Sequence, residues 1–357
     1  MKTMKTLITK ASALIITALV MLLASCIQED ISGDTIIKVD ADATVTMTID
    51  LPGGNLPTTK AMSVAQEGEV KDVDILVFEP NGGKYLYKAV GYDLINDTDS
   101  KKTFKAKLRT GSFDLMILGN SSKAVGDVIS MADITSKTRP ELESLLIEKT
   151  TDKWAADGSR PFPMWGMVAN LTIAADLSLT GEKAIKLNRM NARIDVTVVD
   201  AVEFELTSVH VYNWNSEGSI VPNQSTDAWD AGAPKAKLPN VPSSSVKDAS
   251  KPLIYKDAEI SAKGTEREMY IFEALNLQAN NIEPLPLTDR TCLVIGGKYK
   301  EGEPTYYRVD FANKISDKWV YLNVLRNHHY TVGITEVKGN GHTTPEEAFK
   351  SEPINIE

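Results

Sequence analysis

The sequence predicts an all-β protein made of two tandem antiparallel β-sandwich domains, of the transthyretin or immunoglobulin kind, with few short helices. Short segments rich in Val, Ile, Phe and Tyr recur along the chain, and clusters of Gly, Pro and Asn separate them. Helical periodicity is scarce, and strands do not alternate with helices as a parallel doubly wound sheet requires. A length of 357 residues is long for one sandwich but comfortable for two.

Several segments are predicted as strands because β-branched and aromatic residues dominate each of them. Along the chain these are residues 73–78, 104–108, 112–118, 185–187, 194–199, 204–212, 269–272, 293–295, 306–311 and 329–337. The best helix candidate is 139–149, where Leu142, Leu145 and Leu146 share one face and Pro140 lies near the start. Residues 127–134 are expected to form a short helical turn.

The amino terminus has the pattern of a targeting segment. Lys2, Lys5 and Lys10 precede an apolar run over residues 11–23, which is too short for a spanning helix of about 20 residues. The run ends in Leu23-Ala24-Ser25-Cys26, which resembles a bacterial lipobox. We therefore expect Cys26 to be lipidated and to anchor the chain in the outer membrane. The alternative is an ordinary secretory signal with an incidental cysteine.

The chain is predicted to have four parts. The boundary between the sandwiches is placed within residues 177–182, where Ser, Thr and Gly lie between apolar runs. Residues 222–252 are rich in Pro, Ser, Asp, Ala and Lys, which indicates a long surface excursion. The parts are a signal peptide at 1–25, a lipidated propeptide with the first strand or strands at 26–60, an N-terminal sandwich at 61–180 and a C-terminal sandwich at 181–357.

Charge and cysteine content exclude some classes of partner. The formal charge is −9, and removal of Lys2, Lys5 and Lys10 with the signal peptide leaves −12. An acidic protein of this kind is a poor candidate for binding nucleic acid. Cys292 is the only cysteine besides Cys26, so a lipidated Cys26 leaves no intramolecular disulfide. Cys292 lies in an apolar β-rich run and is expected to be a buried, unreactive thiol.

The most informative segment is residues 37–51, where apolar residues or alanines alternate strictly with polar residues. Side chains alternate across a strand, so the segment predicts a strand with one buried face and one solvated face. At about 3.3 Å per residue it would span roughly 50 Å, so a bulge or break near residues 41–43 is expected. The sizeable apolar members are Ile37, Val39, Val45, Met47, Ile49 and Leu51.

A loop is predicted to follow this strand. Pro52-Gly53-Gly54 ends the alternation, and residues 55–65 contain Lys60-Ala61, a good substrate for a trypsin-like protease in an exposed loop. In one interpretation the strand is simply the first of a sandwich and the loop stays intact. In the other, cleavage after Lys60 allows the lipidated strand to be lost.

The energy of that loss makes the second interpretation consequential. Burial of about six apolar side chains contributes roughly 9–18 kcal/mol, at about 1.5–3 kcal/mol each. The whole net stability of a domain is about 5–15 kcal/mol. A sandwich without the strand would need a replacement from elsewhere. Donation by a neighbouring subunit gives a head-to-tail contact that does not close, and hence a filament.

Several local patterns, in order along nearly all of the mature chain, resemble fimbrillins, the FimA-type major fimbrial subunits or type V pilins of Bacteroidetes. Their specificity comes from their order and from the lipobox, since each pattern is weak alone. They are the strand and turn at 73–78 and 81–85, the strand 111–120 that ends in Asn120, the Pro-Met-x-Gly turn at 163–166, the Leu-x-Arg-x-x-Ala-Arg-Ile run 187–194 and the Arg-Asn-x-x-Tyr run within 325–330.

The resemblance implies a structural subunit of surface fimbriae that supports adhesion. It implies export as an outer-membrane lipoprotein and cleavage by a trypsin-like surface protease, to which Lys60-Ala61 corresponds. It further implies polymerisation with other fimbrial subunits by strand donation, and a receptor on a host or bacterial surface. One departure is the tail, where only Ile354 and Ile356 alternate. Either a longer C-terminal region donates, or the chain is a tip or accessory subunit.

Enzymatic, metal and cofactor functions find little support. Nucleophile-elbow, phosphate-loop and zinc-protease motifs are missing, so no catalytic residue, metal site or cofactor is predicted. His328 and His329 are adjacent on a predicted strand and point to opposite faces. The competing functions are a surface glycan-binding sandwich lipoprotein and a purely structural sandwich lipoprotein, which predicts neither cleavage nor polymers. The candidate residues of the glycan-binding alternative are Trp154, Trp165, Trp214 and Trp229, of which Trp214 and Trp229 are expected to be exposed.

Overall fold

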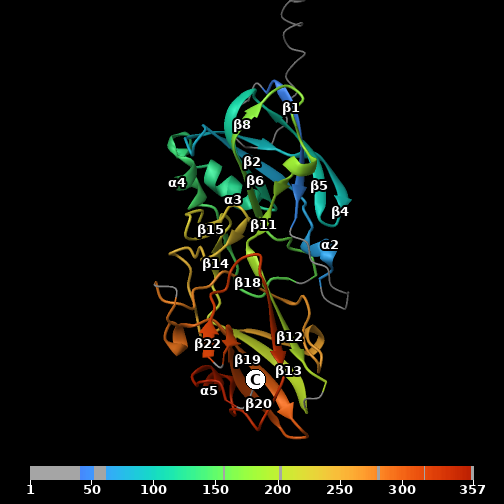
Figure 1. The fold of residues 1–357 in the computed structure, drawn as a ribbon, viewed down its shortest axis with the longest axis vertical. Coiled ribbons are helices and arrows are strands. Elements are labelled where there is room, and N and C mark those ends of the chain that lie inside the picture. The colour runs from blue at the N-terminus through green and yellow to red at the C-terminus, as the bar shows by residue number, and fades with distance from the viewer. Residues whose placement is uncertain are drawn as a thin grey trace, which may run out of the picture. The chain divides into compact units, whose positions relative to one another are not determined.

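A computed structural model describes residues 41–51, 62–155, 157–200, 203–279, 282–316 and 318–354. The chain divides into two units, Met1–Lys38 and Val39–Glu357, and the first lies outside the described residues. The second unit contains two β-sandwiches, each with its own pair of sheets (Figure 1). The predicted fold class is therefore confirmed.

The first sandwich begins with the predicted alternating segment. Its sheets have the orders β10-β1-β5-β4, with β9 also paired to β1, and β11-β8-β6-β2-β3. Side chains from both sheets join one hydrophobic core. The strands are β1 (Ala43–Asp50), β2 (Val73–Phe78), β3 (Tyr85–Val90), β4 (Tyr92–Thr98), β5 (Lys101–Leu108), β6 (Gly111–Gly119), β8 (Met164–Ile173), β9 (Ser178–Leu179), β10 (Ile185–Lys186) and β11 (Asn188–Arg189).

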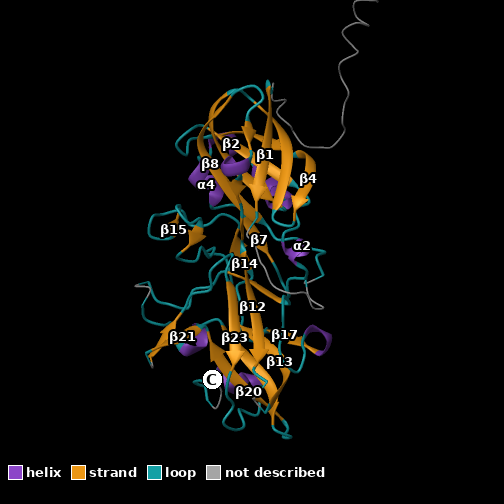
Figure 2. Ribbon diagram, turned by 45° about the vertical axis from the view of Figure 1, so that its right-hand side comes forward, coloured by secondary structure: helices purple, strands orange, loops and turns teal. Residues whose placement is uncertain are grey.

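The second sandwich has a separate core and begins directly after β11. Its sheets have the orders β18-β12-β23 and β17-β13-β19-β20 (Figure 2). Most pairs are antiparallel, but β12 pairs with β23 in parallel, as β1 does with β9 and β10. The strands are β12 (Asn191–Val198), β13 (Phe204–Tyr212), β17 (Leu253–Lys256), β18 (Met269–Phe272), β19 (Cys292–Tyr299), β20 (Pro304–Asp310) and β23 (His329–Ile334).

The predicted helix over residues 139–149 is wrong in its second half. A capping box of Thr138 and Glu141 starts α4, which ends at Glu143. Residues Ile147–Lys149 instead form β7, which pairs with β14 (Glu217–Ser219). Hydrogen bonds to β14 therefore satisfy backbone groups that a longer helix would have paired internally. The expected turn at 127–134 falls on the end of α3 (Ser122–Ile129) and the start of the 3-10 turn η1 (Ile134–Ser136).

The remaining elements lie outside the two main sheet pairs. In the predicted surface excursion, β15 (Trp229–Asp230) and β16 (Lys235–Ala236) form a hairpin. A second hairpin joins β21 (Ala312–Ile315) to β22 (Lys318–Tyr321). Short helical elements are α2 (Val64–Glu67), η2 (Gly181–Lys183), η3 (Asp257–Glu259), η4 (Leu287–Asp289) and α5 (Pro345–Phe349). None of the helices in the described ranges has the length and apolar content to span a membrane.

Strands β10 and β11 pair with β1 and β8, so residues beyond 180 still contribute to the sheets of the first sandwich. Sheet membership does not define where an independently folding unit ends. The predicted divisions at 25/26, 60/61 and 180/181 therefore stay predictions.

Candidate strand-exchange site

Strand β1 is an interior strand of its sheet. It pairs antiparallel with β5 along its whole length, from Ala43 opposite Leu108 to Asp50 opposite Lys101. On its other edge it runs parallel to β9 and β10, with Met47 opposite Leu179 and Ile49 opposite Ile185. Both edges are thus hydrogen-bonded, and loss of β1 would leave unpaired backbone groups on both neighbours.

The apolar face of β1 forms part of the first core. Val45, Met47 and Ile49 are fully buried, and Leu51 is 6% exposed. These four side chains contribute roughly 6–12 kcal/mol of burial energy, at about 1.5–3 kcal/mol each. Their departure would also uncover Phe104 and Ala106, which lie opposite Met47 and Val45 on β5 and are fully buried. The strand is therefore a large part of what stabilises this sandwich.

The polar face of β1 is less solvated than the sequence predicts. Thr44 is exposed and Thr46 is half-buried, but Thr48 is buried. The Thr48 hydroxyl lies 2.8 Å from that of Thr103 on β5. Asp50 forms an ion pair with Lys101 at 3.6 Å. Cross-strand polar pairs cover part of the face that simple alternation assigns to water.

The other predicted site residues fall outside the described residues. These are the lipidation residue Cys26, the strand residues Ile37 and Val39, and the cleavage pair Lys60 and Ala61. Met62, the next residue that the structure describes, is 1% exposed and lies in the first core. The predicted cleavage position is thus one residue before a buried anchor.

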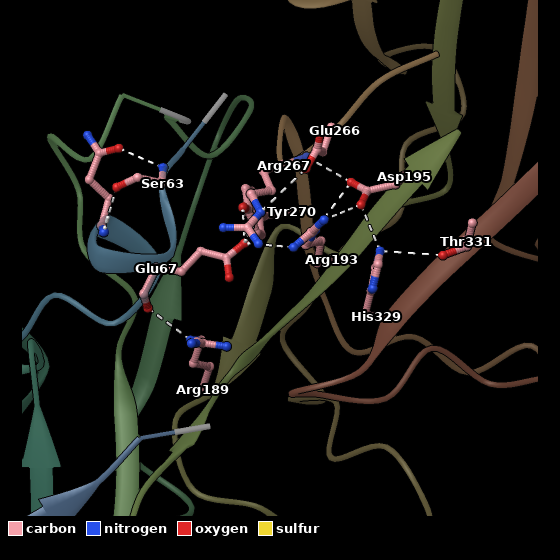
Figure 3. Close-up of polar contacts among 11 residues, drawn as sticks. Ser63, Glu67, Arg189, Arg193, Asp195, Glu266, Arg267, Tyr270, His329 and Thr331 are labelled. Carbon is pink, nitrogen blue, oxygen red and sulfur yellow. Dashed lines mark hydrogen bonds and ion pairs between the residues drawn. The ribbon is translucent and has the colours of Figure 1, made fainter. Parts of the chain in front are cut away.

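Hydrogen bonds fix the segment after the predicted cleavage position, from Ser63 to Glu67. The Ser63 and Gln66 side chains form a capping box around α2, with hydrogen bonds of 3.1 and 2.8 Å. Glu67 ends the helix and is only 3% exposed (Figure 3). Its carboxylate accepts hydrogen bonds from the Tyr270 hydroxyl at 2.7 Å and from Arg193 Nη1 at 3.2 Å. Both partners belong to strands of the second sandwich.

A cluster of buried charges surrounds Glu67. Arg189 Nε donates to the Glu67 carbonyl oxygen at 2.9 Å, and Arg267 Nε lies 4.0 Å from the carboxylate. The Arg267 guanidinium makes no hydrogen bond to any residue that the structure describes. Burial and the Glu67 carboxylate raise the pKa of the Tyr270 hydroxyl, which keeps it a donor. Glu67 therefore supplies a buried negative charge beside the buried guanidinium groups of Arg193 and Arg267.

Asp195 extends this cluster along β12. Arg193 is hydrogen-bonded to its carboxylate, and His329 Nε2 lies 2.7 Å from Oδ2. Burial acts to raise the pKa of Asp195, but the hydrogen bonds from His329 and Arg193 outweigh it and lower that pKa. The sequence singled out Arg189 and Arg193 as part of a motif. It gave no signal for Glu67, Arg267 or Tyr270, which come from distant segments.

Three other motif residues have structural roles. Asn120 directly follows β6 with φ 55°, and its side-chain amide donates to the carbonyl oxygens of Glu69 and Phe162. Gly166 is required because a Cβ there would lie 2.8 Å from the Lys186 carbonyl oxygen, as well as 2.5 Å from Leu187 Cδ2. Arg326 is buried and bonded to Glu273 at 2.7 Å and to the Ile220 carbonyl oxygen at 2.7 Å. These motifs encode junctions between segments that are far apart in sequence.

The expected tryptophan platforms are only partly where they were predicted. The prediction that Trp214 is exposed is wrong, since this residue is 8% exposed and its indole N–H donates to the Lys251 carbonyl oxygen. Trp229 is half-buried and packs edge-on against Trp165, which is buried like Trp154. The tryptophan with a largely exposed side chain is Trp319, at 54%. Sequence reasoning missed it because it lies on β22, a strand of a hairpin outside both cores, and local composition does not show this.

Cys292 has the predicted environment, and His328 and His329 contact different partners. His328 Nδ1 lies 2.8 Å from the Arg326 carbonyl oxygen, whereas His329 contacts Asp195. In the ranges that the structure covers, no group of three or more His, Cys, Asp or Glu side chains could hold a metal ion. Cys292 is fully buried, and burial raises the pKa of its thiol to about 12. A thiol of this kind is unreactive.

The family of this chain is decided by a family model of the major fimbrial subunit protein FimA, which matches residues 43–228. This span begins with β1 and covers just over half of the chain. The chain belongs to the FimA major fimbrial subunit family. The predicted resemblance to fimbrillins is confirmed.

Individual relatives of this FimA-family chain include tip subunits of Porphyromonas gingivalis fimbriae. The minor fimbrium tip subunit Mfa3 is 26% identical over 172 residues, which are 44% of this chain and 37% of Mfa3. The major fimbrium tip subunit FimE is 23% identical over 300 residues, which are 83% of this chain and 48% of FimE. In these matches the chain spans less than half the length of either relative.

A solved structure supports the fold. The tip fimbrial protein Mfa3 of Porphyromonas gingivalis, solved with a C-terminal truncation, superposes with a TM-score of 0.52 at 18% identity. The superposition covers 82% of this chain and 94% of that one. At this identity the likeness establishes the shared architecture only.

Proposed function

We propose that this chain is a structural subunit of surface fimbriae, exported as an outer-membrane lipoprotein through Cys26 and polymerised by strand exchange. The observation that carries the proposal is the position of β1. It is an interior strand with a buried apolar face, and it precedes the predicted cleavage site in sequence. Membership of the FimA family and similarity to fimbrial tip subunits support it.

In this mechanism a trypsin-like surface protease cuts between Lys60 and Ala61. Afterwards only backbone pairing and packing hold β1 in the sandwich. The new amino terminus stays in place because Met62 is buried and Glu67 is tied to Arg193 and Tyr270. Cleavage thus allows β1, on the amino-terminal side of the cut, to dissociate. The segment that contains Met62 and Glu67, on the other side, stays bound.

The site also defines the strand that could replace β1. Such a strand must run antiparallel to β5 and parallel to β9 and β10. It must present apolar side chains at every second position, to fill the places of Val45, Met47, Ile49 and Leu51. Donation by another subunit makes a heterologous contact that does not close, so subunits add into a filament.

We further propose a tip or accessory position for the chain. The observation behind this choice is that the curated relatives described above are tip subunits of two different fimbriae. A tip subunit needs to accept a strand from one neighbour, which the β1 site would provide. Adhesion to a host or bacterial surface would then fall to this subunit.

The mechanism is tested by Lys60→Ala, expressed in place of the wild-type gene. We expect a subunit that keeps its lipid and accumulates as a monomer, because β1 stays covalently attached and continues to fill the site. The readouts are the amino-terminal sequence of the surface protein and electron microscopy of fimbriae. Lys84→Ala, in the exposed turn between β2 and β3, is the matched control and should mature normally. Normal polymer from Lys60→Ala would refute the mechanism.

A further inference from the structure

The second sandwich has a cavity of about 560 Å³ between β20 and β23. These are the outer strands of its two sheets, so the cavity lies where the sandwich is open. Its floor includes Val309, Leu322 and Val332, half-buried side chains that pack against the second core. The volume is in the range of small-ligand sites, about 300–1,000 Å³.

The rim of the cavity carries an exposed aromatic side chain. Trp319 is 54% exposed and belongs to the β21–β22 hairpin, whose two strands pair with each other. Lys314 Nζ lies over one face of the Trp319 ring, 5.8 Å from its centroid, which leaves the other face for a ligand. Tyr321, two residues later, also lines the cavity, and Arg290 covers one face of its ring at 4.7 Å. An indole has a negative π-face and one N–H donor, so it suits a ligand with C–H groups on one side and hydroxyls on its edge.

A polar side chain without an internal partner also lines the cavity. Glu352 is exposed, and its side chain has no hydrogen bond or ion pair to the residues described. Arg308 and Asp310, by contrast, are bonded to each other at 2.7 Å. Asn313 pairs with Val320 across the hairpin, so its side chain lies on the face opposite that of Trp319. The cavity therefore offers one free carboxylate, which favours a ligand that has hydroxyl groups and no negative charge.

The wall formed by β23 adds backbone donors and acceptors. Arg193 N–H donates to the His328 carbonyl oxygen, and Val199 N–H donates to that of Ile334. Even-numbered residues of β23 therefore direct their backbone groups to β12. By alternation, the backbone groups of Thr331 and Gly333 point to the opposite edge, which lines the cavity.

We propose that this cavity binds a neutral oligosaccharide. The free face of Trp319 stacks on the C–H face of one sugar ring, and Glu352 accepts hydrogen bonds from its hydroxyl groups. The partly apolar floor receives the less polar side of the ligand. This ligand class goes beyond the proposed role in assembly, and binding does not depend on cleavage or on strand exchange.

An array of immobilised neutral oligosaccharides, built from glucose, galactose, mannose and N-acetylglucosamine, tests the proposal with the purified full chain. We expect retention on one or more of these sugars, weakened about tenfold or more by Trp319→Ala and largely kept by Trp319→Phe. Val320→Ala is the matched control, because its side chain alternates with that of Trp319 on the same strand and is also exposed.

Two results would overturn the proposal. One is that the wild-type chain is retained on no sugar of the array, as expected if the cavity instead takes up an extended peptide along β23. The other is equal retention of wild type and Trp319→Ala, which would place the binding elsewhere. Circular dichroism of each variant checks that loss of retention is not loss of fold.

Discussion

At the scale of single residues, buried charge links the two sandwiches. Glu67 belongs to a four-residue helix, yet it contacts Arg193 and Tyr270 from strands of the second sandwich. Glu67 contributes to stability mainly through its negative charge, because the positively charged Arg193 and Arg267 beside it are also buried. A neutral residue of the same shape would leave Arg193 with Asp195 as its remaining carboxylate partner, and Arg267 with Glu266 at 4.0 Å.

Glu67→Gln should therefore lower the free energy of unfolding by about 3 kcal/mol, the lower end of what removing one member of a buried ion pair costs. The measurement is equilibrium unfolding in urea at neutral pH. The control is Glu69→Gln, whose side chain is 38% exposed beside Lys71 and should change stability by less than about 1 kcal/mol. Equal losses of unfolding free energy in both variants would show that the buried cluster contributes no more to stability than an exposed ion pair does.

Residue patterns in the sequence revealed the cluster only in part. Arg189 and Arg193 lie in a recognisable run, since a junction of fixed geometry keeps them at fixed spacing. Glu67 could not be paired with them, because 126 positions separate Glu67 from Arg193. Trp319 was missed for a similar reason. Its exposure follows from a hairpin outside both cores, and local composition does not show this.

At the scale of elements, β1 was the most predictable strand. Strict alternation identified its buried face, and Val45, Met47 and Ile49 are indeed fully buried. Its parallel partners β9 and β10 were not predictable as such. Each has two residues, which is too short for a periodic signal. Helix α4 ends early for a related reason, since pairing of β7 with the distant β14 overrides local helix propensity.

The β1 site should accept a strand in trans. A chain that begins at Ala61 should lose roughly 6–12 kcal/mol of burial energy, and a synthetic peptide of residues 37–51 should restore its stability. The measurement is thermal unfolding with and without peptide. A peptide with Met47→Asp should not stabilise the chain, because a charge would enter the core. One with Thr44→Asp, on the exposed face, should act like the original.

Two outcomes would contradict this prediction. If the peptide with Met47→Asp stabilises the shortened chain as well as the original peptide does, the apolar face of β1 is not what the site recognises. If the shortened chain is as stable as the full chain, the strand contributes too little to drive exchange.

At the scale of the whole molecule, the proposed mechanism combines a detachable strand with two sandwiches that stay folded. The two-sandwich architecture followed from chain length and strand content, which the sequence shows directly. The register of β1 against β5 and the charge cluster beyond the predicted cleavage position depend on tertiary contacts. Together they explain how one cut could convert a self-contained subunit into one that accepts a neighbour's strand.

The central claim is that β1 is absent from the assembled subunit. The most direct test is the intact mass of this subunit after dissociation from purified fimbriae, compared with the unassembled protein from the same cells. We predict that the assembled form begins at Ala61 and lacks residues 43–50, whereas the unassembled form retains them with the lipid. An assembled subunit that still contains this segment in one chain would contradict the claim.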